Sequence, residues 1–124
     1  MIDKLVLELN EKFNKLCCSD FYSFEEVSKM RNIMGVYVIY EGATIIYIGK
    51  TNKFHIRFGT DLRHESTHTL VRKLIKSERF KDRIEVKNHF IKSCKIKIEI
   101  CETNRQAEAL EHIAIHILNP FYNK

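Results

Sequence analysis

One glutamate, Glu111, lies where a charged side chain is unusual. The segment Thr103–Leu118 predicts a helix whose apolar face comprises Ala107, Leu110, Ala114, Ile117 and Leu118. At 3.6 residues per turn, Glu111 falls on the border of this face. A carboxylate placed there costs free energy unless it is paired or binds a metal ion. Helix geometry leaves two interpretations equally open, an ion pair with a lysine or arginine and a ligand to a metal.

The polar face of the same predicted helix carries two histidines with the spacing of a helical zinc pair. His112 and His116 are four residues apart, and Glu108 lies one turn earlier. The sequence offers no third ligand at a diagnostic spacing, and polar residues surround the pair. We therefore favour a solvated surface over a metal site for these histidines.

Two tyrosines, Tyr37 and Tyr47, stand ten residues apart on two predicted strands joined by a short turn. A hairpin brings such side chains together when its register places both on one face. Tyrosine is common in strands, so the pair alone predicts only structure. Two glycines change that balance, because Gly35 begins the first strand and Gly49 ends the second. A glycine in a strand often marks the close approach of another backbone or of a ligand.

A basic segment follows the second of these strands directly. Its pattern predicts a helix from Lys53 to Arg63, and its basic residues include Lys50, Lys53, Arg57, Arg63 and His64. The chain has 21 lysines and arginines against 16 acidic residues, for a net charge of +5. Such a balance favours a polyanionic partner, since lysine and arginine neutralise phosphates and release counterions. On these residues alone, a solvated basic face is slightly favoured over a phosphate-binding surface.

The elements that must position these residues follow from hydrophobic periodicity and from capping signals, Ser23 with Glu26 and Thr103 with Gln106. The expected order is helix, helix, hairpin, three helices, strand and helix. It predicts an α/β (α+β) fold, a small three-stranded, largely antiparallel sheet flanked by helices. The expected ranges are Ile2–Leu16, Phe24–Lys29, Gly35–Tyr40 with Thr44–Ile48, Lys53–Arg63, His68–Ser77, Phe80–Lys92, Lys95–Ile100 and Thr103–Leu118.

Size and composition place these elements in one domain. The 124 residues are 44% hydrophobic and 30% charged, and no linker or repeat interrupts them. No apolar run is long enough to span a bilayer, and the first residues lack the layout of a secretory signal, so we expect a cytoplasmic protein. The four cysteines form no C-x-x-C pair. We interpret them as reduced thiols that mostly pack as small apolar residues.

In combination, these residues closely resemble the motifs of the GIY-YIG nuclease family. Tyr47-Ile48-Gly49 matches the second motif literally, and Gly35-Val36-Tyr37 matches the first with one aliphatic change. Lys50-Thr51 continues the family's common extension, and Arg57 stands where the family carries an arginine on the following helix. Each motif alone is weak, but their order and spacing agree.

The resemblance continues towards the C-terminal part of the sequence. Glu108-Ala109-Leu110-Glu111 is similar to the family's glutamate helix, and Asn119–Asn123 to its closing segment, with Asn123 as the family-type asparagine. The match implies a GIY-YIG endonuclease domain over residues 34–124, with residues 1–33 as an N-terminal helical extension packed on it. One position departs from the pattern, because this chain has Asp61 where many members have a histidine or tyrosine. His64 or His68 is the alternative at that place.

The activity that the resemblance implies is metal-dependent DNA cleavage. Glu111, with waters, would hold one divalent cation, Mg²⁺ or Mn²⁺. Arg57 would bind the scissile phosphate and offset its growing negative charge. Tyr37 would deprotonate or hold the attacking water, Tyr47 would orient the phosphate or the water, and Asn123 would brace the site by hydrogen bonds.

Further residues complete the implied site around this catalytic set. Gly35 and Gly49 would permit close strand packing. We identify no separate DNA-recognition domain, so recognition of DNA shape, or targeting through a protein partner, is expected for a chain that we favour as a monomer. The residues expected to contact DNA phosphates are Lys50, Lys53, Arg63 and His64.

Two other functional interpretations compete with the nuclease. The chief one is a catalytically weak or inactive module that keeps the fold and only binds nucleic acid. The presence of both tyrosines, Arg57 and Glu111 argues against it. The other is an accessory subunit whose first helix, Ile2–Leu16, docks on a partner protein. We prefer the simpler interpretation that this helix covers the domain's own core.

Overall fold

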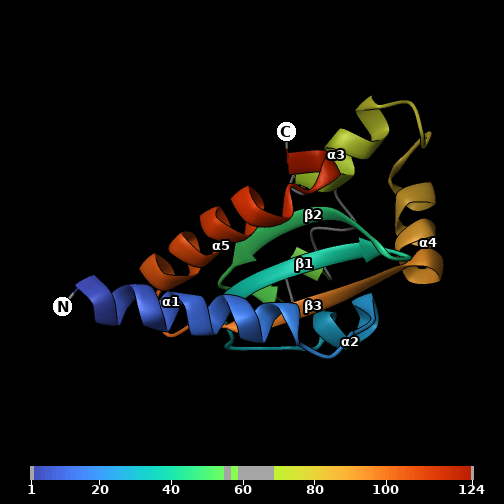
Figure 1. The fold of residues 1–124 in the computed structure, drawn as a ribbon. Helices are drawn as coiled ribbons and strands as arrows, with labels where there is room; N and C mark the ends of the chain where they lie inside the picture. Colours follow the sequence, from blue (N-terminus) through green and yellow to red (C-terminus); the bar gives the residue numbers. More distant parts are fainter. Residues whose placement is uncertain (1, 55–56, 59–68, 124) are drawn as a thin grey trace.

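The sheet is built from three strands in the part of the chain that the computed structural model describes, residues 2–54, 57–58 and 69–123 (Figure 1). The strands are β1 (Gly35–Glu41), β2 (Thr44–Thr51) and β3 (Cys94–Ile100), in the order β2-β1-β3 with both pairs antiparallel. The predicted three-stranded antiparallel sheet is therefore confirmed. Because β1 is central, β2 lies at an edge of the sheet.

Helices cover both faces of this sheet. Figure 1 shows α1 and α5 side by side along one face, while α4 lies beyond one end of the strands. In the described ranges, none of the helices is long and apolar enough to cross a membrane. The bounds are α1 (Ile2–Cys17), α2 (Phe24–Ser28), α3 (Thr69–Lys76), α4 (Arg83–Ser93) and α5 (Asn104–Leu118), followed by the 3-10 turn η3 (Phe121–Asn123).

The alternation of side chains divides the core into two clusters, one on each face. One cluster is aromatic, and in it Tyr37 and Ile39 of β1 pack with Phe24, Phe54, Phe58 and Phe90. The other is aliphatic, and in it Val36 and Val38 pack with Ile48, Leu16 and the α5 residues Ala107, Leu110 and Ala114. Adjacent residues of β1 thus serve opposite faces, as a strand with a period of two requires.

Side-chain caps set several helix boundaries. The predicted capping box of α2 is present, since Ser23 Oγ accepts from the Glu26 N–H at 3.1 Å and Glu26 accepts from the Ser23 N–H at 2.9 Å. At α4 the expected start at Phe80 is wrong. The Asp82 carboxylate caps the helix by accepting from the backbone N–H groups of Ile84 and Glu85, each at 3.0 Å.

The cap of α5 also differs in one detail from the expected capping box. Thr103 accepts from the Gln106 N–H at 3.1 Å, as expected. The Gln106 side chain, however, accepts from the N–H of Glu102 rather than from that of Thr103. The helix ends where Asn119 adopts a left-handed conformation, with φ of 47°, directly before Pro120.

The first helix is tied to β3 by polar contacts as well as by its apolar face. Lys12 Nζ lies 3.0 Å from the Glu99 carboxylate and donates to the Ile100 carbonyl oxygen at 2.7 Å. At the other end of the helix, Lys97 Nζ donates to the carbonyl oxygen of Cys17 at 2.6 Å. Leu16 is fully buried in the aliphatic cluster.

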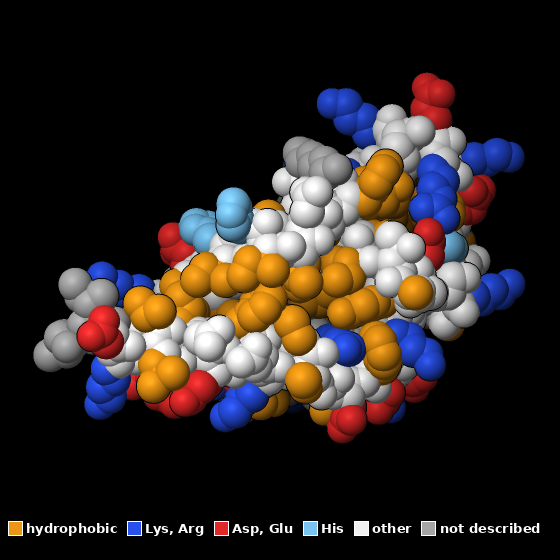
Figure 2. Space-filling view, in the orientation of Figure 1, with side chains coloured by type: hydrophobic (Ala, Val, Ile, Leu, Met, Phe, Trp, Pro, Cys, Tyr) orange, Lys and Arg blue, Asp and Glu red, His pale blue; other side chains and the backbone are white. Residues whose placement is uncertain are grey.

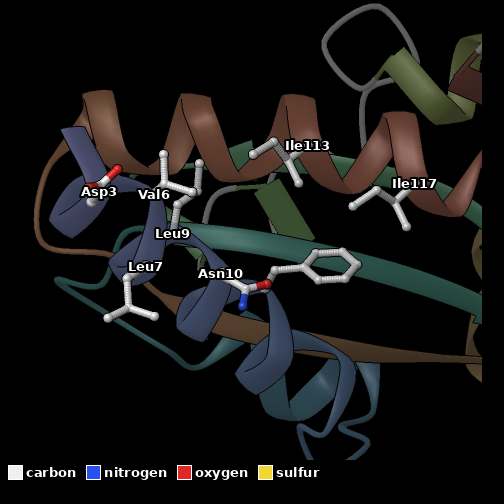
Figure 3. A pocket seen from close by; sticks show the side chains of 8 residues that line it. Asp3, Val6, Leu7, Leu9, Asn10, Ile113 and Ile117 are labelled. Atoms are coloured by element: carbon white, nitrogen blue, oxygen red, sulfur yellow. The ribbon is translucent and has the colours of Figure 1, made fainter.

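One residue of the predicted apolar face of α5 does not face the sheet. Ile117 is 57% exposed and, with Ile113, lines an open apolar hollow of about 470 Å³ between α5 and α1 (Figure 3). Hydrophobic side chains gather in a band over this region in Figure 2. Of the predicted apolar face, Ala107, Leu110 and Ala114 are buried, whereas Ile117 lies beside them and borders the hollow. The lining of the hollow contains none of the predicted site residues.

The four cysteines are free, and two of them are buried. Cys94 lies in the aromatic cluster and Cys101 in the aliphatic one. Burial raises the pKa of the Cys94 thiol to about 12. These two residues behave as the small apolar side chains that the sequence predicts, whereas Cys18 is exposed.

We predict that Gly35→Ala destabilises the fold by about 3 kcal/mol, because the added Cβ overpacks a backbone contact. That Cβ would lie less than 3.0 Å from the Glu99 carbonyl oxygen of β3, which cannot turn aside as a side chain can. Urea unfolding would measure the loss.

The matched control for this variant is Gly42→Ala, at the turn of the hairpin. A Cβ there meets nothing within 4 Å, but its φ of +61° costs a non-glycine residue about 1–2 kcal/mol. If Gly35→Ala were no more destabilising than Gly42→Ala, the proposed steric need for glycine at position 35 would be wrong.

Candidate active site

The hairpin register places the two predicted tyrosines on one face of the sheet. Tyr37 pairs with Gly49, and Ile39 pairs with Tyr47, so both rings project into the same layer. Their centroids lie 6.3 Å apart. The Tyr37 ring also packs edge-on against Phe58, with centroids 4.8 Å apart, and it is only 2% exposed. Tyr37 is therefore held firmly, while Tyr47 lies at the border of the same cluster.

Gly49 makes room for the hydroxyl end of Tyr37. A Cβ at position 49 would lie closer than 3.0 Å to both Oη and Cζ of Tyr37. The two motif glycines thus have different neighbours, since Gly35 adjoins the backbone of β3 and Gly49 adjoins a side chain. Close strand packing, the role expected of both, describes Gly35 only.

Asn123 binds the outer edge of β2 between Tyr47 and Gly49. Its Oδ1 accepts from the Ile48 N–H at 2.7 Å, and its Nδ2 donates to the Ile48 carbonyl oxygen at 2.7 Å. An amide is suited to this place, because one end accepts while the other donates. The side chain therefore replaces the neighbouring strand that an edge lacks, and it fixes the backbone that carries the second motif.

Glu111 approaches the same edge from α5. Its carboxylate accepts from the backbone N–H of Lys50, two residues beyond the N–H that Asn123 binds. Alternate N–H groups of a strand point to the same side, so the two side chains lie roughly 7 Å apart along one edge. Asn123 and Glu111, which are twelve residues apart in sequence, meet at the second motif.

Burial of Glu111 makes its charge costly. The side chain is 18% exposed, and burial raises the pKa of its carboxyl. The positive charge of Lys50, that of His112 and the Lys50 N–H act in the opposite direction without cancelling the shift. The border position predicted for Glu111 is thus confirmed. The sequence left open an ion pair and a metal ligand. The positive charge of Lys50 supports an ion pair in part, but it does not fully offset the cost of burying the Glu111 carboxylate.

Arg57 is attached to the aromatic cluster beside Tyr37. It stands between Phe54 and Phe58, which both pack on the Tyr37 ring, and its backbone N–H donates to the Lys53 carbonyl oxygen at 3.0 Å. The Arg57 side chain is half-buried, and its Nε atom is fully buried. The helical turn expected around this residue is present in the described positions.

Other predicted residues are more dispersed. Lys53 is exposed, and Lys50 Nζ reaches Asn104 at the start of α5 at 3.5 Å. His112 is 67% exposed, in agreement with the solvated surface that we favoured. The predicted phosphate-binding residues Arg63 and His64 lie outside the described residues, as do Asp61 and its alternative His68.

Lys73 of α3 is a neighbour of the site that sequence reasoning missed. Its ammonium lies 5.9 Å from the centroid of the Tyr47 ring and donates to the Tyr122 carbonyl oxygen at 2.6 Å. It thereby links α3, β2 and η3 with one cation. No pattern in the sequence marks Lys73, since a lysine on the polar side of an amphipathic helix is usually only solvated.

The arrangement of a central hairpin, a glutamate helix and a closing turn is the GIY-YIG endonuclease fold, an α/β fold with an open antiparallel sheet. No family model and no curated protein matches the sequence. The resemblance first inferred from the motifs is therefore supported by structure rather than by overall sequence similarity.

The solved structures that match belong to the N-terminal endonuclease domain of UvrC from Thermotoga maritima. The magnesium-bound form has a TM-score of 0.56 and 19% identity, over 81% of this chain and 93% of that domain. Two point mutants bound to the catalytic divalent cation give TM-scores of 0.56 at 19% and 18% identity. At these identities the likeness shows the fold.

We predict that Asn123→Asp lowers the free energy of unfolding by about 1–3 kcal/mol, because it leaves the Ile48 carbonyl oxygen facing a carboxylate instead of a donor. Urea unfolding at neutral pH would measure the loss. Asn52→Asp, at an exposed position just after β2, introduces the same charge without breaking these bonds. Equal effects of the two substitutions would contradict a stabilising role for the two hydrogen bonds between Asn123 and Ile48.

Proposed function

We propose that this chain is a metal-dependent DNA endonuclease that hydrolyses phosphodiester bonds at the edge of β2. The supporting observation is the convergence of Glu111 and Asn123 on Lys50 and Ile48, the segment that continues from Tyr47. This convergence joins the second motif, the glutamate helix and the closing segment in one place. The GIY-YIG endonuclease fold supports the same function.

The chemistry of Glu111 fits a divalent cation. A half-buried carboxylate with a raised pKa is stabilised by additional positive charge, and an oxygen ligand suits Mg²⁺ or Mn²⁺. When bound, such a cation supplies a Lewis acid that offsets charge on the phosphate and on the leaving oxygen. Glu111 holds it, while the Lys50 N–H keeps the carboxylate oriented towards the strand edge.

The remaining residues bind the substrate and position water. Arg57 binds the scissile phosphate with its planar fork, and its neighbours in the chain, Phe54 and Phe58, pack on the Tyr37 ring. Tyr37 holds the attacking water or accepts its proton. The latter requires nearby positive charge, since an ordinary tyrosine has a pKa of about 10. Tyr47 orients the phosphate or the water.

DNA binding is assigned to the basic groups around the second motif. Lys50 and Lys53 follow Tyr47 directly, and Arg63 and His64 continue the same segment in the sequence. Lys73 adds a cation at the Tyr47 ring. In this scheme residues 1–33 are an extension that supports the catalytic domain, residues 34–124.

The alternative is a module with this fold that binds nucleic acid without cutting it. Asp61 leaves it open, because many members of the family have a histidine or tyrosine at this position. Salt-sensitive binding of DNA without any Mg²⁺- or Mn²⁺-dependent cleavage would establish this alternative. Cleavage that EDTA abolishes would exclude it.

We predict that Glu111→Gln and Arg57→Ala each reduce DNA cleavage at least about a hundredfold, because each removes charge stabilisation that acts on the reacting phosphate. Nicking of supercoiled plasmid in Mg²⁺ or Mn²⁺ would measure the loss. His116→Ala is the matched control, since it alters an exposed polar residue of the same helix. Circular dichroism would verify the fold of each variant, and full activity of either site variant would refute its role.

The raised pKa of Glu111 also predicts a stability change in metal-free buffer. A carboxyl whose folded pKa lies above its unfolded value destabilises the fold once it is ionised. Glu111→Gln should therefore raise the free energy of unfolding at neutral pH, and the gain should shrink as the pH falls through the folded pKa of Glu111 and vanish below its unfolded pKa. Thermal unfolding across the acid range would measure this.

Added Mg²⁺ provides the second arm of that experiment. It should stabilise the wild-type protein and leave Glu111→Gln unchanged, because only the ionised carboxylate binds the cation. A glutamine variant that is less stable than wild type at neutral pH in EDTA would show that the buried charge is already compensated within the protein.

A further inference from the structure

A second group of ligand-type side chains lies at the turn end of the sheet. Glu41 ends β1, Cys94 begins β3, and His89 lies on α4. One ligand atom from each of the three lies within 4.8 Å of the other two. Among the described residues, this is the group of histidine, cysteine and acidic side chains arranged to hold a metal ion.

The topology brings these residues together. Glu41 and Cys94 are directly opposed in the β1–β3 register, and opposed residues project to the same face of a sheet. The chain passes from α4 into β3 without a loop, so His89 lies just over one helical turn before Cys94. Phe90, next to His89, is fully buried in the aromatic cluster with Cys94 and anchors the helix there.

Packing leaves the group partly sheltered from water. Cys94 is 4% exposed, and the side chains of His89 and Glu41 are 18% and 26% exposed. The His89 ring packs against Phe80, with centroids 5.0 Å apart, and its Nε2 contacts the Glu41 carboxylate. The imidazole is therefore held with Nε2 pointing towards Glu41.

We propose that Glu41, His89 and Cys94 form a zinc site. Thiolate, imidazole and carboxylate are all ligands that zinc takes in proteins, and three protein ligands leave a fourth position for water. The ligand atoms of a tetrahedral zinc site lie roughly 3.3–3.7 Å apart, given bond lengths of about 2.0–2.3 Å. Small side-chain rotations achieve this spacing from the one observed. A sulfur ligand disfavours Mg²⁺, which prefers oxygen.

Arg79 occupies the solvent side of this group and competes with the metal. Its Nη2 lies 2.7 Å from Glu41 Oε2, the oxygen that His89 also contacts. The Arg79 side chain is 42% exposed, stacks over Phe80 and also hydrogen-bonds Tyr122, so turning towards solvent breaks the Tyr122 contact but leaves no buried charge. The rival interpretation is an ion-pair network of Arg79, Glu41 and His89 with no metal.

Zinc binding here needs no oxidant or other reactant. The Cys94 S–H bond breaks and its proton passes to solvent, while the sulfur, the His89 Nε2 lone pair and a Glu41 oxygen form bonds to the cation. The site is separate from Glu111. Glu41 lies five positions beyond Val36, which pairs with Lys50, and this separates the two regions by roughly 17 Å along the sheet.

The test uses the full chain, stripped of metal with EDTA and then freed of chelator. We expect one equivalent of Zn²⁺ to bind, as measured by competition with a chromogenic chelator. Substitution by Co²⁺ should produce a sulfur-to-cobalt charge-transfer band, which reports the Cys94 thiolate directly. Cys94→Ser should abolish that band, and His89→Gln should weaken zinc binding at least tenfold.

The control variants separate this site from other metal-binding groups. Cys101→Ser alters a buried thiol of the aliphatic cluster, and His116→Ala alters the spaced histidine pair on α5. Both should bind zinc as the wild type does. Arg79→Ala should bind zinc several-fold more tightly, because it removes the competing cation. His89→Gln, which alters a less buried residue, covers the case in which Cys94→Ser does not fold.

Three results would overturn the zinc site. One is the absence of both stoichiometric Zn²⁺ binding and the charge-transfer band. Another is binding that Cys94→Ser and His89→Gln leave intact, which would indicate adventitious zinc elsewhere. The third is a strong loss of stability in Arg79→Ala without tighter zinc binding, which would establish the ion-pair network. None of these readouts depends on DNA cleavage, so they are independent of the proposed nuclease activity.

Discussion

The candidate active site depends on the outer edge of β2. An edge strand presents backbone N–H and C=O groups that need partners, and here two distant side chains provide them. Asn123 binds both backbone groups of Ile48, and Glu111 accepts from the Lys50 N–H. The hydrogen bonds that complete the sheet are thus the same ones that bring the closing turn and the glutamate helix to the second motif.

The aromatic layer holds the other half of the site in place. Tyr37 is buried between Phe58 and the space left by Gly49, so its hydroxyl position is set by packing. Arg57 belongs to the turn that presents Phe54 and Phe58 to the same ring. The phenol and the backbone that carries the arginine are therefore held by one apolar cluster, while the carboxylate and the amide are held by hydrogen bonds at the strand edge.

Sequence reasoning reached most of the fold because its signals are local. Caps at Ser23 and Thr103, alternation in β3 and the turn at Gly42 each specify an element without tertiary information. Glu111 was found because a charge on an apolar border is anomalous. The exposure of Ile117 on the predicted apolar face was not foreseen, since helix periodicity does not show how far α1 covers α5. Lys73 and the Glu41–His89–Cys94 group carry no local signal at all, because strand register and helix packing alone bring them to their neighbours.

The irregularity in β2 has a consequence for the pairing of the hairpin. Ile39 pairs with Tyr47 while Tyr40 pairs with Ile45, so Ile46 is an extra residue in the strand. The β1–β2 pairing on the turn side of Ile46 is therefore offset by one residue from the pairing on the side that carries the motifs. The bulge separates the turn-side pairs, Tyr40 with Ile45 and Glu41 with Thr44, from the pairs that carry the motifs, such as Tyr37 with Gly49. The hairpin consists of two segments: the turn side is held by β3, where Tyr40 pairs with Lys95 and Glu41 with Cys94, and the motif side is constrained by the aromatic layer and by the hydrogen bonds at the outer edge of β2.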